Sequence, residues 1–270
     1  METGHRQFSI EAPSSHLSSP ISKLFARCDL HVHTNLSPCS REEMTLQDII
    51  RAAEEQGIEH LAITDHIHPS TDRSIIDHVR GQCNRLNSTM NIYVGCEADV
   101  VAVGEVTVDP ALADRADFVM VAANHFQDRF ISQPPTRKSR DVALHYLEML
   151  RFAASLELAD VIAHPLFVVP GTYDPLAPAE LTEEDLLPVV ELAARNSIAV
   201  EISRRALAPE QRPFLLSFYR LCKQAGLKFA IGSDAHQLAD VGRTYLVEPL
   251  ILELGLTDED IWLPKGGYSS

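Results

Sequence analysis

Short apolar runs that end in polar residues alternate along the chain with segments of helical period. The first run, 28–33, leads through a turn to residues 45–54, where apolar residues recur at helical spacing. Thr45 is suited to cap the start of this helix, and Gly57 to end it. A repeated order of strand, loop, helix and stop is typical of parallel strands joined by crossover helices, so the pattern predicts an α/β fold.

Seven apolar runs are candidate strands. They are residues 28–33, 58–64, 91–97, 118–123, 160–163, 198–202 and 228–231. An eight-stranded α/β barrel usually takes about 250 residues, so a closed or nearly closed barrel of seven strands fits this 270-residue chain. We expect one barrel domain over 27–250. Residues 1–26 are expected to form a surface strap or a partly disordered extension, and 251–270 a C-terminal tail.

Composition narrows the class of protein. With 45% hydrophobic and 23% charged residues, the chain reads as a soluble globular protein with one large core. Its formal charge of -15 opposes non-specific binding to nucleic acid or to an anionic membrane. Five cysteines without paired spacing indicate a reducing compartment. No secretory signal and no uncharged apolar run of about 18 residues is present, so we expect a cytoplasmic protein.

Histidines and acidic residues occur where the predicted strands end. His31 and His33 lie two positions apart, about 6.6 Å along one face of a strand. Taken alone, this pair is more typical of an ordinary half-exposed strand than of a metal site. Further candidates follow other strands: Asp65, His66, Glu97, His125, His164, Asp234 and His236. The C-terminal ends of parallel strands share one rim of a barrel. The whole set therefore predicts a single site to which several strands contribute side chains.

These motifs, in this order, resemble the PHP family, the polymerase and histidinol phosphatase metal-dependent phosphoesterases. The resemblance is carried by Glu97, His125 and four segments: Asp-Leu-His-Val-His-Thr at 29–34, Ile-Thr-Asp-His at 63–66, Asp-Val-Ile-Ala-His-Pro at 160–165 and Gly-Ser-Asp-Ala-His at 232–236. It implies a distorted seven-stranded (β/α)7 barrel resembling a TIM barrel. It also implies two or three divalent ions of zinc, manganese or iron, and hydrolysis of a phosphate ester.

The resemblance also implies a set of metal ligands, with Glu97 bridging two ions. The set is His31, His33, His66, Glu97, His125, His164, Asp234 and His236. Many members carry an acidic residue or a histidine where this chain has Cys39. The Cys39 thiolate is either a soft ligand for a third ion or an ordinary loop residue. Cys28 and Cys96 are weaker candidates, because strand alternation turns them away from the ligand face.

The number of donors bears on the reaction. Zinc takes about four ligands, so eight or nine side chains are too many for one ion. A cluster of ions would supply hydroxide as the nucleophile and neutralise the phosphoryl oxygens. The local positive charge of the ions would let a chain of charge -15 bind an anion.

Other side chains are candidates for orienting the substrate. Asp65 is expected to orient a metal-bound imidazole, and His68 to act as a general acid or to contact the substrate. Arg243 is either a bidentate phosphate clamp or a surface ion-pair partner. Four further basic residues are candidate substrate contacts, although exposed charges are more often solvated: Arg204, Arg205, Arg137 and Lys138.

The leading hypothesis is a phosphomonoesterase for a small metabolite, namely a sugar, nucleotide or amino-alcohol phosphate. One alternative is a phosphodiesterase or nuclease of the same family, although the acidic charge and the lack of an aromatic and basic stripe oppose long nucleic acid as the substrate. Another is a non-catalytic binding module stabilised by metal, and hydrolysis of a C–N bond is also open. The sequence leaves the substrate, the native metal and the oligomeric state open.

Overall fold

The computed structural model describes residues 22–265 and has an α/β fold with mostly parallel strand pairing, as expected. The strands are β1 (Cys28–Val32), β2 (His60–Ile63), β3 (His66–Ile67), β4 (Asn91–Val94), β5 (Cys96–Ala102), β6 (Glu105–Val106), β7 (Val119–Ala122), β8 (Val161–Ala163), β9 (Ala199–Ile202) and β10 (Phe229–Ile231). The α-helices are α1 (Leu46–Glu55), α2 (Ile75–Cys83), α3 (Pro110–Ala113), α4 (Ser139–Ser155), α5 (Glu183–Arg195), α6 (Arg212–Gln224) and α7 (Glu248–Leu254). Within residues 22–265, no helix has the length and apolar character needed to cross a bilayer.

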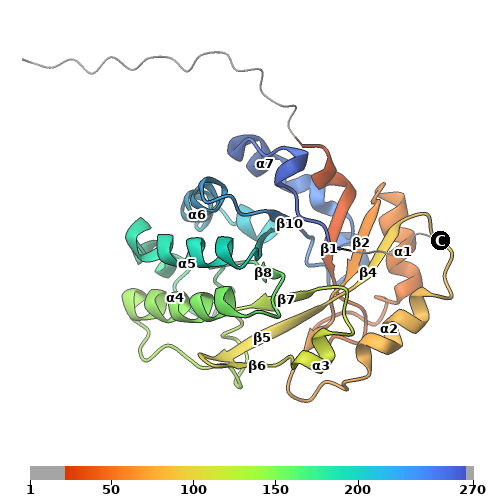
Figure 1. Ribbon diagram of the computed structural model, residues 1–270, viewed down its shortest axis with the longest axis horizontal. Helices are drawn as coiled ribbons and strands as arrows, with labels where there is room; N and C mark the ends of the chain where they lie inside the picture. The colour runs from red at the N-terminus through yellow and green to blue at the C-terminus, as the bar shows by residue number, and fades with distance from the viewer. Residues whose placement is uncertain (1–21, 266–270) are drawn as a thin grey trace, which may run out of the picture.

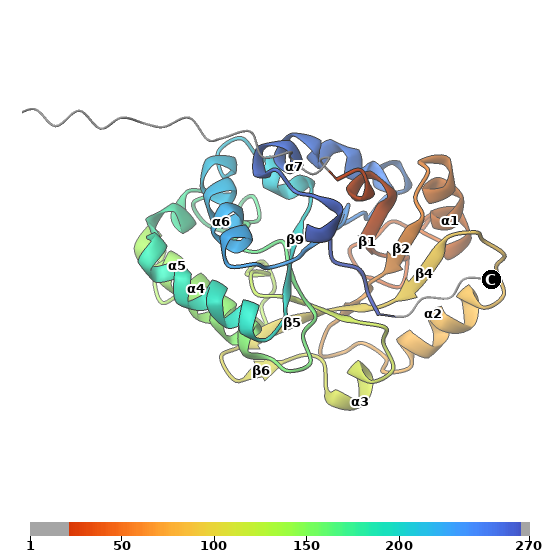
Figure 2. The ribbon, with the colours of Figure 1, turned by 45° about the horizontal axis from the view of Figure 1, so that its top comes forward.

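The strands form two hydrogen-bonded sheets. One has the order β1-β2-β4, and the other has the order β10-β9-β8-β7-β5-β3, with β6 antiparallel to β5. The strands lie on the inside and the helices around them, with α1 and α2 beside the first sheet and α4, α5 and α6 on the opposite side (Figures 1 and 2). Because both faces of the strands are covered, their side chains are almost all buried.

The single strand expected at 91–97 is two strands that belong to different sheets. The chain passes from β4 into β5 at Gly95, where an added Cβ would lie 2.7 Å from the Phe118 ring. The Gly95 amide donates to the Ile63 carbonyl at 2.9 Å, whereas the Glu97 amide donates to the Asp65 carbonyl at 3.1 Å. Glycine is needed here because the backbone approaches Phe118 too closely for any side chain.

The other ends of the two sheets are also joined. The Asp234 amide, just after β10, donates to the His31 carbonyl at 2.8 Å. The His33 amide donates in turn to the Ala235 carbonyl at 3.1 Å. These two bonds bring the 233–236 loop against the end of β1, which places residues from both ends of the chain at one rim.

The first helix begins and ends as the sequence predicts. The Thr45 hydroxyl accepts a hydrogen bond from the Asp48 amide at 3.3 Å, which caps the free N–H groups at the start of α1. Gly57 follows the helix with φ +74°, a left-handed conformation that glycine adopts without steric cost. Both predictions are confirmed.

The C-terminal residues differ from the expected tail. Helix α7 runs across the expected boundary at 250, because its apolar face packs on the core and buries Leu250, Ile251 and Leu254. Farther on, the Trp262 amide donates to the Phe229 carbonyl of β10 at 2.9 Å. Residues 251–265 are therefore part of the same packed unit as the strands.

Only the end of the expected N-terminal extension falls within the described residues. Residues 1–21 lie outside them. The Ser22 hydroxyl donates to the Asp258 carboxylate at 2.6 Å, and Phe25 is buried in the 3-10 helix Leu24–Arg27. The segment from 22 is thus fixed against the C-terminal residues.

Truncation tests whether the C-terminal residues belong to the folded unit. Deletion of 250–270 removes five buried apolar side chains: Leu250, Ile251, Leu254, Leu256 and Ile261. At about 1.5–3 kcal/mol each, their loss matches the whole stability of a typical domain. We expect no cooperative thermal unfolding from this variant and normal unfolding from a control that ends at Lys265. A melting temperature within about 2 °C of the full chain for both variants would contradict this account.

Candidate metal centre

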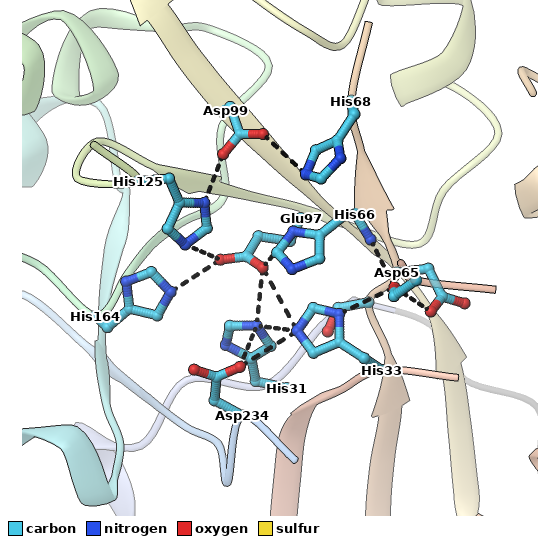
Figure 3. Close-up of polar contacts among 12 residues, drawn as sticks. His31, His33, Asp65, His66, His68, Glu97, Asp99, His125, His164 and Asp234 are labelled. Atoms are coloured by element: carbon cyan, nitrogen blue, oxygen red, sulfur yellow. Dashed lines mark hydrogen bonds and ion pairs between the residues drawn. The ribbon is translucent and has the colours of Figure 1, made fainter. Parts of the chain in front are cut away.

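The structure brings eight of the expected metal ligands together at one rim of the strands, and Figure 3 labels all of them except His236, which lies against His33. His31 lies in β1, His66 in β3 and Glu97 in β5, while the other ligands stand in the loops after β1, β7, β8 and β10. Seven of the eight side chains are buried, and His236 is partly exposed. This convergence follows from parallel pairing, which points the C-terminal ends of the strands the same way.

The fully buried carboxylate of Glu97 is the centre of this group. Its Oε2 atom lies 3.3 Å from His31 Nε2, 3.5 Å from His33 Nε2 and 3.0 Å from His66 Nδ1. Its Oε1 atom lies 2.9 Å from His164 Nε2 and 3.7 Å from His125 Nε2. One carboxylate thus faces five imidazole rings.

The outward nitrogens of the first two rings have acceptors that set where their protons lie. His31 Nδ1 is 2.9 Å from a carboxylate oxygen of Glu201, so this nitrogen donates. His33 Nδ1 is 3.3 Å from the Ser37 hydroxyl. That hydroxyl gives its own proton to Asp65 at 2.7 Å, so it must accept from His33. In the neutral tautomers, both Nε2 atoms would carry lone pairs that a cation can use. Without a cation, burial is outweighed by Glu201 and Glu97, which raise the pKa of His31 well above its usual value.

His125 and His164 are held in the same way. His125 Nδ1 lies 2.6 Å from Asp99 Oδ1. His164 Nδ1 lies 3.1 Å from Asn124 Oδ1, while the Asn124 amide nitrogen donates to the His164 and Phe167 carbonyls. The inward Nε2 atoms of both rings therefore face Glu97 Oε1.

The inward nitrogens converge on two buried carboxylates, which is the chemical reason that the site suits a metal. The Nε2 atoms of His31 and His33 are 3.0 Å apart, and both face Glu97 and Asp234. Among the described residues, the buried atoms His66 Nδ1 and Glu97 Oε2 have no hydrogen-bond partner. A divalent cation would satisfy all these donors at once, and imidazole with carboxylate suits zinc, iron and manganese.

The two inward carboxylates stay charged despite burial. Burial alone would raise the pKa of Glu97, but the surrounding imidazoles, His31 foremost, outweigh it and hold the pKa well below its usual value. Burial is likewise outweighed at Asp234, where Arg205 and then His31 hold the pKa well below its usual value. Both carboxylates are therefore anionic at neutral pH.

Four overlapping triplets of donors have ligand atoms within 4.8 Å of one another. They are His31–His33–Glu97, His66–Glu97–His125, His33–His66–His236 and His31–His164–Glu201. Cys39 belongs to none of these triplets within residues 22–265, although its exposed side chain lines the adjoining cavity. The geometry thus brings the histidines and acids together and leaves Cys39 at their edge.

A cavity of about 810 Å³ opens beside the centre, a volume that suits a small metabolite. His68, Arg204 and Arg205 line it, as do the ligands His125, His164 and Asp234. Arg205 also forms an ion pair with Asp234, and Arg204 pairs with Asp240 at 2.8 Å.

Three of the expected substrate contacts are not among the residues that line this cavity. The Arg137 side chain donates to the Thr172 carbonyl and stacks on Tyr173, and Lys138 precedes helix α4 as its N-cap. Arg243 lies 3.9 Å from Asp240 and contacts the exposed Tyr245. These contacts match the alternative of surface ion pairs and solvated charges for all three residues.

Sequence reasoning missed the residues that orient the imidazoles, namely Asp99, Glu201, Asn124 and Ser37. A signal existed for two of them. Asp99 stands two positions after Glu97, so it lies on the same face of β5. Glu201 is an acidic residue inside an apolar strand, and a buried acid needs partners. Asp65, which was expected to orient a metal-bound imidazole, is linked to the His33 ring through the Ser37 hydroxyl.

The chain belongs to the PHP domain family, whose pattern it matches over residues 29–205, more than half of its length. This match contains six of the eight expected ligands. Asp234 and His236 lie beyond it, so their place in the site rests on the geometry above.

Two relatives and one solved structure extend this result. The chain is 26% identical over 235 residues to a probable phosphatase of Caldicellulosiruptor saccharolyticus, covering 85% of this chain and 88% of the relative. It is 26% identical over 234 residues to a probable histidinol-phosphatase of Thermotoga maritima, covering 84% and 90%. A histidinol phosphate phosphatase of Lactococcus lactis, solved with zinc, L-histidinol and phosphate, shares the fold at TM-score 0.63 and 16% identity, covering 86% and 94%. The chain is accordingly a hydrolase of the phosphatase class.

Gly232 provides a structural test of the centre. A Cβ at this position would lie 2.4 Å from the Cβ of His31 and 2.7 Å from Glu201 Oε1. We expect Gly232→Ala to displace His31, to cost about 1–3 kcal/mol of unfolding free energy and to lower the zinc content of the purified protein. Gly81→Ala is the control, because Gly81 lies in helix α2 with only the flexible end of Arg85 near it. Unchanged zinc content in both variants would show that the close approach at Gly232 is unimportant.

Glu201 provides a second test. Its two oxygens accept from His31 Nδ1 at 2.9 Å and from the His164 amide at 2.6 Å. Glu201→Gln keeps the shape but removes the charge, so we expect zinc affinity to fall about 10–100-fold in competition with a chromophoric chelator. The exposed Glu210→Gln is the matched control. Equal affinities of the two variants would count against an orienting role for Glu201.

Proposed function

We propose that this protein is a metal-dependent phosphomonoesterase that acts on a small phosphorylated metabolite. The observation that carries the proposal is the buried Glu97 carboxylate, faced by imidazole lone pairs and opening on a cavity of metabolite size. Family membership supports the phosphatase reaction. The sugar, nucleotide and amino-alcohol phosphates named above remain the candidate substrates, and the L-histidinol and phosphate in the Lactococcus lactis structure support the last of these.

Two or three divalent ions fit this donor set. His31, His33 and Asp234 would hold one ion and His125 and His164 another, with Glu97 shared between them. His66 and His236, with Cys39 at the edge of the cavity, are the donors left for a third. The zinc in the Lactococcus lactis structure supports zinc as one of the metals. When bound, such ions activate water and offset the charge of the phosphoryl oxygens.

Arg205 is placed to bind the phosphate. Its Nε atom is engaged by Asp234, which leaves the other guanidinium N–H groups toward the cavity that it lines. An arginine fixed in this way donates to phosphoryl oxygens with little loss of side-chain entropy. Arg204, held by Asp240, also lines the cavity.

His68 is the proposed general acid. It lines the cavity, and its Nε2 atom lies 3.7 Å from Asp99 Oδ2. That oxygen is buried and has no hydrogen-bond partner among the described residues. From this place beside Asp99, the His68 imidazole can give a proton to the leaving alkoxide.

We further propose that the two sheets form the distorted seven-stranded barrel that the resemblance implies. The hydrogen bonds between β1 and the 233–236 loop, together with the continuous chain from β4 to β5, support this arrangement. A barrel would explain why donors from both ends of the sequence share one rim.

The function is tested by loading the purified protein with zinc or manganese and measuring phosphate release from sugar, nucleotide and amino-alcohol phosphates. We expect turnover of at least one monoester, its loss on chelation, and its recovery when metal is restored. His31→Ala combined with His33→Ala should abolish turnover and metal retention while the protein stays folded by circular dichroism. If the protein with verified metal content releases phosphate from none of these monoesters, the proposal is wrong. Hydrolysis of bis(4-nitrophenyl) phosphate alone would favour the phosphodiesterase.

A further inference from the structure

Part of the cavity lining is apolar. It includes Phe167, Val169 and Pro170, from the loop after β8, together with Pro38 and Ala208. Phe167 is 6% exposed and Val169 is half-buried. We name the surface formed by Phe167, Val169 and Pro170 the apolar wall.

Two buried amide side chains hold the apolar wall in place. Asn124 donates to the Phe167 carbonyl at 2.8 Å. Gln211 accepts from the Val168 amide at 2.8 Å and donates to the Val168 carbonyl at 3.1 Å. Both amide residues are buried, at 2% and 6% exposure. The backbone of the wall is therefore fixed before any ligand binds, which lowers the entropy cost of binding.

Arg205 lies between the apolar wall and the ligands. It pairs with Asp234 on one side, and its guanidinium carbon lies 5.3 Å from the centre of the Phe167 ring on the other. A phosphate held by Arg205 and the metal centre would thus direct its ester group along Phe167 and Val169. The charge of the neighbouring Arg204 is offset by the buried Asp240, so this side of the cavity suits an uncharged group.

We propose that the apolar wall binds the leaving group and selects phosphate monoesters of aromatic or otherwise apolar alcohols over those of polyols. The inference rests on the proposed phosphatase function and adds the class of alcohol. A polyol placed on this wall would lose hydrogen bonds to water without replacement, whereas an aromatic ring would gain apolar contact. Phe167 and Val169 are the specificity-determining residues.

Binding of non-hydrolysable analogues tests the wall without requiring turnover. The probes are benzylphosphonate and 3,4-dihydroxybutylphosphonate, which replace the ester oxygen of phenyl phosphate and glycerol phosphate with carbon. Calorimetry on the zinc-loaded protein should show benzylphosphonate binding at least about tenfold more tightly. Val169→Asn should remove most of this preference, and Val169→Ile should keep it.

Leu176→Asn is the matched control, because Leu176 is 52% exposed and does not line the cavity. It should leave both affinities unchanged. Equal affinities of the two probes in the unmodified protein would overturn the inference, as would equal losses for both probes in Val169→Asn. If neither probe binds, both the inference about the apolar wall and the proposed phosphate site are wrong.

Turnover separates failure of the inference from failure of the proposed function. Phenyl phosphate should show a KM about tenfold below that of glycerol phosphate, and Val169→Asn should raise the KM for phenyl phosphate alone. If both esters are hydrolysed with equal kcat/KM, the phosphatase function stands and the apolar wall does not select. If neither is hydrolysed but the binding preference remains, the wall stands and the catalytic proposal fails.

Discussion

The structure depends on the burial of one carboxylate, Glu97, among imidazole rings. A buried charge is costly unless it is paired, and here every pairing group is itself buried. The outward nitrogens of the rings are held by Glu201, Asp99 and other acceptors, which leaves lone pairs directed inward. Such an arrangement of donors suits cations, and the strands and loops that hold it fix its geometry.

The backbone conformation also serves to direct side chains toward Glu97. His164 and Asp234 both have positive φ, at 24° and 52°, which side-chain-bearing residues adopt at a cost of about 1–3 kcal/mol. Each lies where a strand ends and turns a ligand inward. Gly232 lets β10 approach His31, where no side chain fits. The rim is thus built from tight turns that hold ligands, and the packed strands and helices below keep those turns in place.

The sequence predicts the α/β class and the rim position of the ligands because strand alternation and parallel pairing are local, regular properties. It does not predict the division at Gly95, because that depends on the Phe118 ring, which is distant in sequence. Tertiary packing also places α7 on the core, where a tail was expected. The partners of the imidazoles come from other strands, so sequence reasoning about single motifs missed Glu201 and Asp99.

The central claim is that divalent ions lie between Glu97 and the surrounding imidazoles. X-ray absorption at the zinc edge of the zinc-loaded protein measures this environment directly. The account predicts nitrogen and oxygen neighbours at about 2.0–2.2 Å, with the outer scattering typical of several imidazole rings. A shell dominated by sulfur at about 2.3 Å, or one of oxygen without imidazole scattering, would contradict it.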